Sequence, residues 1–386
     1  MIANKHITKI IAVIMAAACC LCLTAIIFAD ELTDMSAGLG LTTEYESQLF
    51  GTETPISINI IMDEADWEDM LTNATAEEYY QCDVEINGEI FYRVGIRPKG
   101  NTSLITIASD PDTDRYSLKL EFDQYVDGQT CYGLDKLVLN NNYADATNMK
   151  EALIYDMYQY LGADASLYNY AKISVNGEYW GVYLALEAVE DSFLLRNYGT
   201  ENGALYKPDS MNIGGGSSDG GFSMGGFPMS SSGANLNYSD DDPDSYSTIW
   251  EGEVTQNTDT DHKRVITALK NISEGSNLET CMDVDNLLKY MAVHVFSVNE
   301  DSLSGVMAHN YYLYESDGQL NIIPWDYNLA LGGMSGMGSK GGGNSATDVV
   351  NAAIDQAFSG TEFFDTLMEN EAYQGTYYSY LRQPTA

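Results

Sequence analysis

Apolar and polar residues alternate along much of the first half of the chain. Residues 56–74 begin with the run ISINII, which predicts a strand, and continue with a helical pattern that Asp63 caps. Residues 82–100 alternate around Asn87-Gly88, a dipeptide typical of the tight turn in a β-hairpin. The same alternation predicts two further strands, at 116–125 and 135–143.

One helix interrupts this strand-rich region, over residues 145–162, and Gly162 ends it. The apolar residues that recur at helical spacing are Met149, Leu153, Met157 and Leu161. Residues 170–189 then predict another hairpin, which turns at Asn176-Gly177. Strands, one helix and more strands indicate an α+β region.

The second half of the chain differs in composition and in pattern. Residues 210–247 are rich in Gly, Ser and Asp and predict an insertion with little capacity to fold. The elements expected beyond it are helices at 262–272, 284–298 and 346–382, a hairpin at 310–329 with its turn at Asp317-Gly318, and a Gly-rich loop at 332–345. This half is therefore expected to be mostly helical around one hairpin.

The N-terminus has the pattern of an export signal. Lys5 and Lys9 precede twenty residues without a charge, and acidic residues follow. We therefore predict that residues 1–29 are a signal peptide or signal anchor, that residues 30–54 are a polar tether, and that residues 55–386 form the domain. Cleavage, lipidation at a nearby cysteine and retention as a membrane anchor all stay open.

The chain is strongly acidic. Removing residues 1–29 leaves 16 Lys and Arg against 57 Asp and Glu, a net charge of −41. Such a field repels nucleic acid and anionic lipid, so we expect no nucleic-acid partner and membrane contact only through the N-terminal segment. The remaining cysteines, Cys82, Cys131 and Cys281, are odd in number and widely spaced, so they are not a disulfide framework or a zinc site.

Three polar residues of the second half are expected to converge. Asp301 follows the helix predicted at 284–298, whereas Asn310 and Asp326 stand at the two ends of one hairpin. The turn at Asp317-Gly318 brings those two ends together. Two carboxylates and an amide suit Mg²⁺, a hard ion that prefers oxygen ligands and keeps waters and phosphates.

Phosphoryl transfer uses such a set of residues in this order along the chain. In protein kinases a base Asp precedes a metal-binding Asn, and a metal-binding Asp on a hairpin follows before a flexible segment. Here the Gly-rich loop occupies the place of that segment. The structural alternative is that Asp301 caps a turn and Asn310 satisfies the end of a strand.

Several blocks of the sequence together resemble the CotH family, the spore-coat protein H kinases. These blocks are GIRPKGNTS, LVLNNNYADATNMKEALIYDMY, ISVNGEYWGVYLALE, LYK, NEDSLSG, HNYYLY and IIPWDYNLALG, in the family's order over roughly residues 55–335. The resemblance implies an atypical protein-kinase-like fold of two lobes, a β-rich N-lobe and a mostly helical C-lobe. It also implies an ATP- and magnesium-dependent kinase that acts on Ser or Thr of secreted or coat proteins.

The resemblance assigns roles to individual residues. Asp301 matches the catalytic aspartate, and Asn310 and Asp326 match the metal ligands. The residues expected to bind the nucleotide are Arg97, Lys99, Lys119, Glu151, Lys207 and Trp325. Among these, Lys119 would reach the α- and β-phosphates with Glu151 as its ion-pair partner, and Trp325 would stack on the adenine.

The sequence therefore predicts a monomeric, secreted or surface-attached protein kinase with ATP and Mg²⁺ as cofactors and a protein Ser or Thr as acceptor. The alternative is a non-catalytic cell-surface binding or scaffold module that keeps the kinase-like fold.

Overall fold

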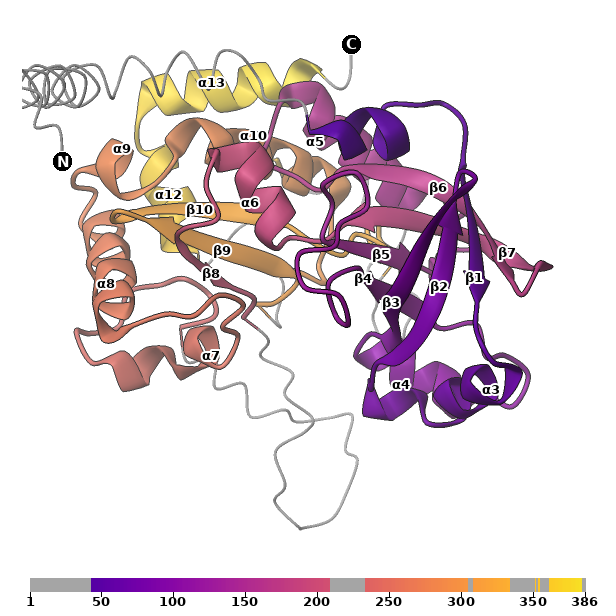
Figure 1. The fold of residues 1–386 in the computed structure, drawn as a ribbon. Coiled ribbons are helices and arrows are strands. Elements are labelled where there is room, and N and C mark those ends of the chain that lie inside the picture. The colour runs from indigo at the N-terminus through magenta and orange to yellow at the C-terminus, as the bar shows by residue number, and fades with distance from the viewer. Residues whose placement is uncertain are drawn as a thin grey trace, which may run out of the picture. The chain divides into compact units, whose positions relative to one another are not determined.

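Seven strands of the first half of the chain close into a barrel. The computed structural model describes residues 43–208, 233–304, 308–333, 351, 353–354 and 361–383, as Figure 1 shows. The strands are β1 (Ile56–Ile61), β2 (Tyr80–Ile86), β3 (Glu89–Lys99), β4 (Ser117–Glu121), β5 (Lys136–Asn140), β6 (Tyr168–Val175) and β7 (Glu178–Glu187). Their order is β1-β2-β3-β4-β5-β7-β6, and parallel pairing of β6 with β1 closes the barrel.

Both predicted hairpins of this region are confirmed. Asn87 and Gly88 join β2 to β3 with φ of 50° and 92°, and Asn176 and Gly177 join β6 to β7 with φ of 50° and 85°. Two consecutive positive φ angles are the geometry of the turn that matches strand twist, and Asn-Gly adopts it with little strain. The alternating apolar residues of the strands, such as Ile58, fill the interior of the barrel.

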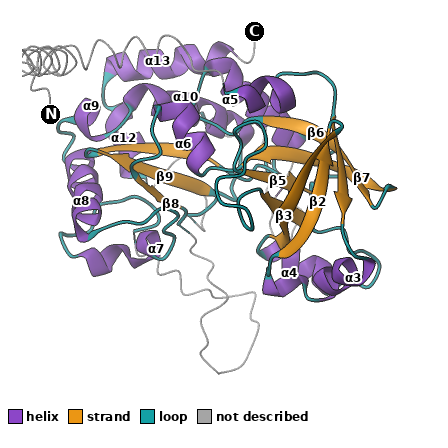
Figure 2. Ribbon diagram, in the orientation of Figure 1, coloured by secondary structure: helices purple, strands orange, loops and turns teal. Residues whose placement is uncertain are grey.

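Helices lie at one end of the barrel and between the barrel and the second half of the chain, where Figure 2 shows them in purple. They are α3 (Glu64–Thr72), α4 (Thr102–Ala108), α5 (Lys150–Leu161), α6 (Asp191–Tyr198), the 3-10 turn η2 (Ala74–Ala76) and the π-helical turn η1 (Glu46–Phe50). Asp63 caps α3 as expected, because its carboxylate accepts a hydrogen bond of 2.9 Å from the backbone of Ala65.

The helix predicted over 145–162 begins later and buries another face. It starts at Lys150, and Gly162 ends it with φ of 65°, as predicted. Met149 and Leu153 are 62% and 45% exposed, so the predicted apolar stripe is wrong in its first half. The buried face instead carries Ile154, Tyr155, Tyr158 and the acidic Glu151. Because Glu151 is polar, a pattern based on hydrophobicity does not identify this face as buried.

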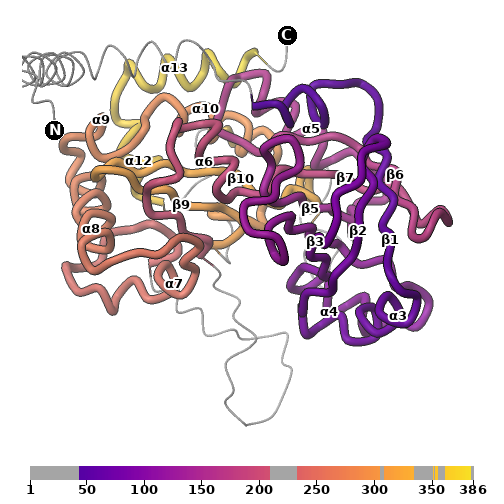
Figure 3. The backbone as a smooth tube through the Cα atoms, in the orientation of Figure 1, coloured from indigo at the N-terminus to yellow at the C-terminus, as the bar shows by residue number. Residues whose placement is uncertain are grey.

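The second half combines helices with a three-stranded sheet. Its strands are β8 (Ala204–Tyr206), β9 (Tyr311–Ser316) and β10 (Gln319–Pro324), in the order β10-β9-β8. Its helices are α7 (Ser247–Trp250), α8 (Asp259–Ser273), α9 (Leu278–Cys281), α10 (Val284–Ser297), α12 (Glu362–Met368), α13 (Glu371–Arg382) and the 3-10 turn η3 (Pro243–Tyr246). The path of the backbone in Figure 3 brings β8 beside β9, although about a hundred residues separate them.

The predicted insertion at 210–247 folds in part. Residues 209–232 lie outside the described residues, but the segment that follows packs into the core through Ala234, Leu236 and Tyr246. The Tyr246 hydroxyl also donates to the carbonyl of Asp240 at 2.8 Å. An acidic segment with one well-placed Tyr can therefore be ordered, which composition alone did not indicate.

The folded part begins before the predicted domain boundary. Residues 45–386 cluster as one unit, and η1 buries Tyr45 and Leu49 completely. The Tyr45 hydroxyl donates to Glu187 at 2.5 Å. The polar tether predicted over 30–54 is therefore wrong for residues 45–50, since two apolar anchors fix them to the barrel.

The predicted leader, residues 1–29, lies outside the described residues. Within the part of the chain that the structure describes, no helix combines the length and the apolar character needed to cross a membrane. In the same part, Cys82, Cys131 and Cys281 are buried free thiols.

Candidate functional site

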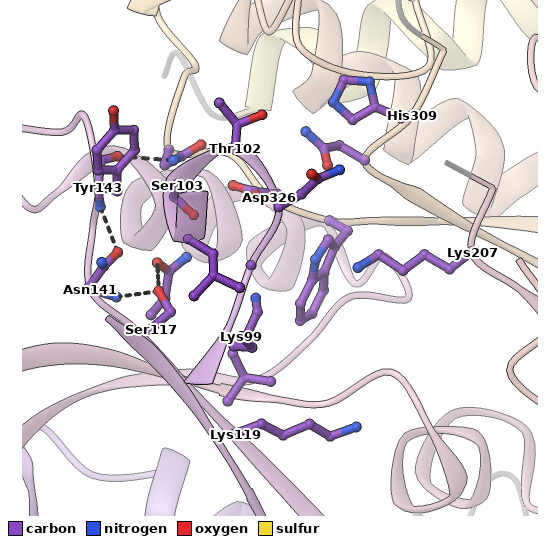
Figure 4. Close-up of a pocket in the computed structure, with 18 of the residues that line it drawn as sticks. Lys99, Thr102, Ser103, Ser117, Lys119, Asn141, Tyr143, Lys207, His309 and Asp326 are labelled. Atoms are coloured by element: carbon purple, nitrogen blue, oxygen red, sulfur yellow. Dashed lines mark hydrogen bonds between the residues drawn. The ribbon is translucent and has the colours of Figure 1, made fainter. Parts of the chain in front are cut away.

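A cavity of about 710 Å³ brings together residues from the barrel and from the β9–β10 hairpin. Figure 4 shows Lys99, Lys119 and Lys207 around it, with Asp326 and His309 on the side of the hairpin. Its charged lining residues are Glu77, Arg97, Lys99, Lys119, Glu190, Lys207, Asp301 and Asp326. Every predicted site residue lines this cavity except Glu151, which lies behind its wall.

The register of the hairpin places Asn310 and Asp326 at one mouth, as predicted. Pro324 pairs with Tyr311, so the residues just beyond the paired strands face each other. Both Asn310 and Asp326 adopt positive φ, 57° and 56°, which turns the chain sharply at each strand end. Asn310 donates from its amide nitrogen to the backbone oxygen of Asp301 at 2.9 Å and to its carboxylate at 3.2 Å. The amide oxygen of Asn310 therefore faces away from Asp301.

Asp301 is held from two sides. One carboxylate oxygen lies 3.0 Å from Nε2 of His309, and the other accepts the hydrogen bond from Asn310. Sequence reasoning gave no role to His309, although its position directly before Asn310 was the available signal. These two partners fix the orientation of the carboxylate in the cavity.

A buried histidine ties together the two loops that carry Asp301 and Asp326. His294 of α10 lies 3.0 Å from the Tyr327 hydroxyl through Nδ1 and 2.7 Å from the Ser304 hydroxyl through Nε2. Burial lowers the pKa of His294 to about 3, so it is neutral at physiological pH. The neutral ring holds the loops by hydrogen bonds without adding a charge to the core.

Lys99 is the cation that faces the acidic centre. It ends β3, and its side chain extends into the cavity in Figure 4. Desolvation lowers the pKa of Lys99, and attraction by Asp326 and Glu151 opposes that shift. The charge of Lys99, rather than that of Lys119, therefore acts on Glu151.

Glu151 is 2% exposed and comes from the first turn of α5. It accepts hydrogen bonds from the Asn140 amide at 2.6 Å and from the backbone of Tyr327 at 3.3 Å. Burial and then repulsion by Asp326 raise the pKa of Glu151 to about 8, whereas Lys99 lowers it. Burial likewise raises the pKa of Asp326, where Lys99 opposes the shift and Asp301 adds to it.

The predicted ion pair between Lys119 and Glu151 is wrong. Lys119 binds Glu190 at 2.5 Å, and Lys136 binds the other oxygen of Glu190 at 2.6 Å. Glu190 is the N-cap residue of α6, in the short connection after β7 ends at Glu187. It contacts lysine side chains of β4 and β5. Lys119 and Lys99 lie on adjacent strands and line the same cavity, so alternation along the strands could not decide between them.

Arg97 and Lys207 complete the basic lining. The Arg97 guanidinium pairs with Glu77 and also donates to the carbonyl of Pro98 at 3.0 Å. The Lys207 ammonium lies 5.5 Å from the centroid of the Trp325 ring, and that of Lys99 lies 5.3 Å from it. Both distances are typical of cation–π attraction.

Trp325 is only 4% exposed, because Tyr312 packs edge-on against it at 5.4 Å in addition to the two lysines. An adenine ring would have to displace a lysine to stack on this indole. The role of Trp325 in binding the base stays a prediction, and the geometry makes it a support for two ammonium groups.

The loop that follows β3 closes the cavity on the side of α4. Gly100 has φ of 136°, and a Cβ there would lie 2.8 Å from the Ser103 hydroxyl, so a side chain would not fit. The backbone nitrogen of Asn141 donates to the Ser117 hydroxyl at 3.1 Å beside this loop, as Figure 4 shows. The turn from β3 into α4 therefore requires glycine at Gly100.

The residues around Asp326 offer oxygen ligands that fit a magnesium ion. Among the described residues, no group of three or more His, Cys, Asp or Glu could hold a metal. One oxygen of Asp326 is nevertheless buried without a hydrogen-bond partner in the described part of the chain. One carboxylate together with amide oxygens provides too few ligands for Ca²⁺. The same groups suit Mg²⁺, because this ion takes most of its ligands from water and phosphate.

The comparisons with known proteins decide the family. The family described as "CotH kinase protein" matches residues 96–385. The chain belongs to the CotH family. The match begins within β3, so it includes every residue predicted for the site.

A curated relative agrees with this membership. The chain is 27% identical over 213 residues to the inner spore coat protein H of Bacillus subtilis (strain 168). The aligned region covers 53% of this chain and 52% of the relative, so the chain spans about half the length of the curated CotH protein it matches.

Proposed function

We propose that this chain is an atypical protein kinase with a β-rich N-lobe and a mostly helical C-lobe. It would transfer the γ-phosphate of ATP, with Mg²⁺, to Ser or Thr of a secreted or surface protein. Membership of the CotH family supports the reaction class. The barrel on one side of the cavity and the helices around β9 and β10 on the other support the two-lobed arrangement.

One observation carries the proposal. Lys99 and Asp326 at the cavity wall and the buried Glu151 form a charge cluster in which desolvation shifts all three pKa values toward the neutral forms. Proteins retain such unfavourable clusters mainly at functional sites. A strand lysine, a helix glutamate and a metal-binding aspartate are also the groups that must be in place in a protein kinase.

The residues of this chain then have distinct tasks. Asp301, oriented by His309 and Asn310, would accept the proton of the acceptor hydroxyl as its oxygen attacks the γ-phosphorus. The bond from that phosphorus to the β,γ-bridging oxygen breaks, and ADP leaves. When bound, Mg²⁺ would neutralise phosphate charge, and Asp326 with Asn310 would hold it. Lys99 would orient the phosphates while Glu151 orients Lys99.

The remaining basic residues would attract the donor electrostatically. Lys207 lies on the side of the cavity opposite β3 in Figure 4 and is positioned against Trp325 and Tyr312. Lys119 and Arg97 are each paired with a carboxylate, so their contribution to phosphate binding would be smaller.

The place of action and the partner belong to the same proposal. The N-terminal pattern supports export, and the relative is named for the inner spore coat, so we place this kinase at or beyond the cell surface as a monomer. A net charge of −41 after removal of the leader favours acceptor proteins with basic segments and disfavours nucleic acid.

A transfer assay tests the function. The protein lacking residues 1–29 is incubated with γ-labelled ATP, Mg²⁺ and casein, and labelled casein is measured. Asp301→Asn should reduce the rate by about 10²–10⁴-fold, because general base catalysis contributes that much. Asp317→Asn is the matched control, since it makes the same change in the exposed turn between β9 and β10 and should leave the rate unchanged.

A non-catalytic scaffold is the second candidate, because His309 and Asn310 each contact one oxygen of the Asp301 carboxylate. The same contacts would fix this loop in a protein that has no catalytic activity. The two functions differ in a thermal-shift experiment. Mg-ATP should raise the melting temperature of the wild type but not of Asp326→Ala, whereas no shift in either protein favours the scaffold.

A further inference from the structure

Two buried oxygen atoms in one short segment have no hydrogen-bond partner among the described residues. They are Oδ1 of Asp326 and Oδ1 of Asn328, two residues apart after β10. Asn328 is 9% exposed, and both residues line the cavity. A buried acceptor without a hydrogen-bond partner lowers the stability of the fold by about 1–3 kcal/mol. Two such acceptors only two residues apart therefore need an explanation.

The orientation of the Asn328 amide is determined by its other end. Its Nδ2 donates to the backbone carbonyl of Tyr143 at 3.0 Å. Rotating the amide by half a turn would place its oxygen against that carbonyl oxygen, which is repulsive. The carbonyl of Tyr143 is itself fixed, because the backbone nitrogen of Tyr143 donates to Asn141 at 3.0 Å. The oxygen of Asn328 is therefore the atom without a partner.

Tyr327, between Asp326 and Asn328, packs into the core, whereas its two neighbours lie at the cavity. Tyr327 is completely buried, and its hydroxyl bonds to His294 and, at 2.6 Å, to Tyr158. Its two neighbours instead line the cavity. The sequence Asp-Tyr-Asn thus anchors its middle residue in the core and presents one carboxylate oxygen and one amide oxygen at the cavity wall.

We propose that Asn328 is a ligand of the divalent cation and that its amide oxygen binds the ion together with Asp326. Both atoms are shielded from bulk water, but Mg²⁺ approaches oxygen to about 2.0–2.1 Å, closer than a water molecule can. A neutral amide adds a ligand without adding a third negative charge beside Asp326 and Glu151. The inference rests on the proposed function and adds a ligand to its metal site.

Binding of Mn²⁺ alone tests this assignment without any catalytic readout. Free Mn²⁺ is measured by electron paramagnetic resonance as the protein without residues 1–29 is titrated, first without and then with ATP. Asn328→Ala should raise the Kd for Mn²⁺ at least about tenfold. Asp326→Ala defines the background from weak binding to the many other acidic side chains.

Two further variants separate ligation from a structural role. Asn328→Asp keeps an oxygen at the site but sets its second oxygen against the Tyr143 carbonyl, so it should bind Mn²⁺ more tightly than Asn328→Ala. Asn321→Ala removes an equally buried amide from β10 that does not line the cavity, so its Kd should stay within about twofold of the wild type.

The outcomes distinguish this inference from the proposed function. If Asn328→Ala binds Mn²⁺ like the wild type while Asp326→Ala loses binding, the Asn328 assignment is wrong and the metal site stands. If Asp326→Ala also binds Mn²⁺ like the wild type, the metal site of the proposed function fails as well. Mn²⁺ binding by Asn328→Asp that is no tighter than that of Asn328→Ala would make Asn328 a structural residue and overturn the inference.

Discussion

Two charge clusters contribute residues to the same cavity and are built in opposite ways. In the Glu190 cluster, each oxygen of Glu190 binds a different lysine, Lys119 at 2.5 Å and Lys136 at 2.6 Å. Burial acts to raise the pKa of Glu190, but attraction by the two lysines outweighs it and the pKa is lowered. Every charge in this cluster is stabilised by its neighbours.

The Asp326 cluster, which consists of Lys99, Glu151 and Asp326, holds charges that the fold does not stabilise. Burial raises the pKa of both carboxyl groups and lowers that of Lys99. One oxygen of Asp326 has no hydrogen-bond partner among the described residues. The comparison indicates that the Glu190 cluster supports the architecture, whereas the Asp326 cluster is kept for a ligand that completes it.

Replacement of one acid in each cluster should have the largest effects, and the two replacements should change stability in opposite directions. Asp326→Asn should lower phosphate transfer by about 10³-fold, as loss of a group that stabilises transition-state charge does, and should raise the melting temperature without Mg²⁺. Glu190→Gln should instead lower stability by about 2 kcal/mol, because it leaves two lysines without their carboxylate. Calorimetry with the transfer assay checks both, and a stability loss in Asp326→Asn would contradict the contrast.

Replacement of Lys99 and of Lys119 should show the same contrast between function and stability, with smaller effects. Lys99→Met should reduce transfer by about 10²-fold, because the phosphates lose the cation that would bind them beside Glu151 and Asp326. Lys119→Met keeps the apolar stem and should change transfer by less than about tenfold while it lowers the melting temperature. Equal loss of transfer in both variants would return the phosphate-binding role to Lys119.

The pH dependence of stability between about pH 5 and 8 should report on the Asp326 cluster through Glu151. The carboxyl group of Glu151 has an ordinary pKa of 4.5 in the unfolded chain and a pKa of about 8 in the folded protein. Between these values the folded state binds more protons, so its contribution to stability falls as pH rises from about 5 to 8. Glu151→Gln should flatten this fall in urea unfolding, and an unchanged slope would show that Glu151 is not perturbed.

The smallest effect is expected at Trp325, which supports Lys99 and Lys207. Trp325→Leu should weaken ATP binding several-fold, because each cation–π contact contributes about 0.5–1 kcal/mol. Trp250→Leu is the control, since Trp250 stacks on His262 at 3.9 Å and does not line the cavity. Isothermal calorimetry measures both, and equal ATP affinity in Trp325→Leu and wild type would remove this role.

The sequence predicted the backbone better than the charge pairs. Asn-Gly and Asp-Gly turns identified the hairpins, and the turn at Asp317-Gly318 was sufficient to bring Asn310 and Asp326 together. Which lysine meets Glu151 depends on how α5 lies against the barrel, and no local pattern contains that information. Asn328 and His309 were missed for the same reason, since an isolated Asn or His has meaning only through its partners.

A crystal structure with Mn²⁺ and a non-hydrolysable ATP analogue tests the central claim most directly. The account predicts an anomalous peak about 2.0–2.2 Å from Oδ1 of Asp326, with the phosphates between Lys99 and Lys207. A nucleotide bound elsewhere, or a cavity that stays empty at saturating Mn²⁺ and nucleotide, would contradict it.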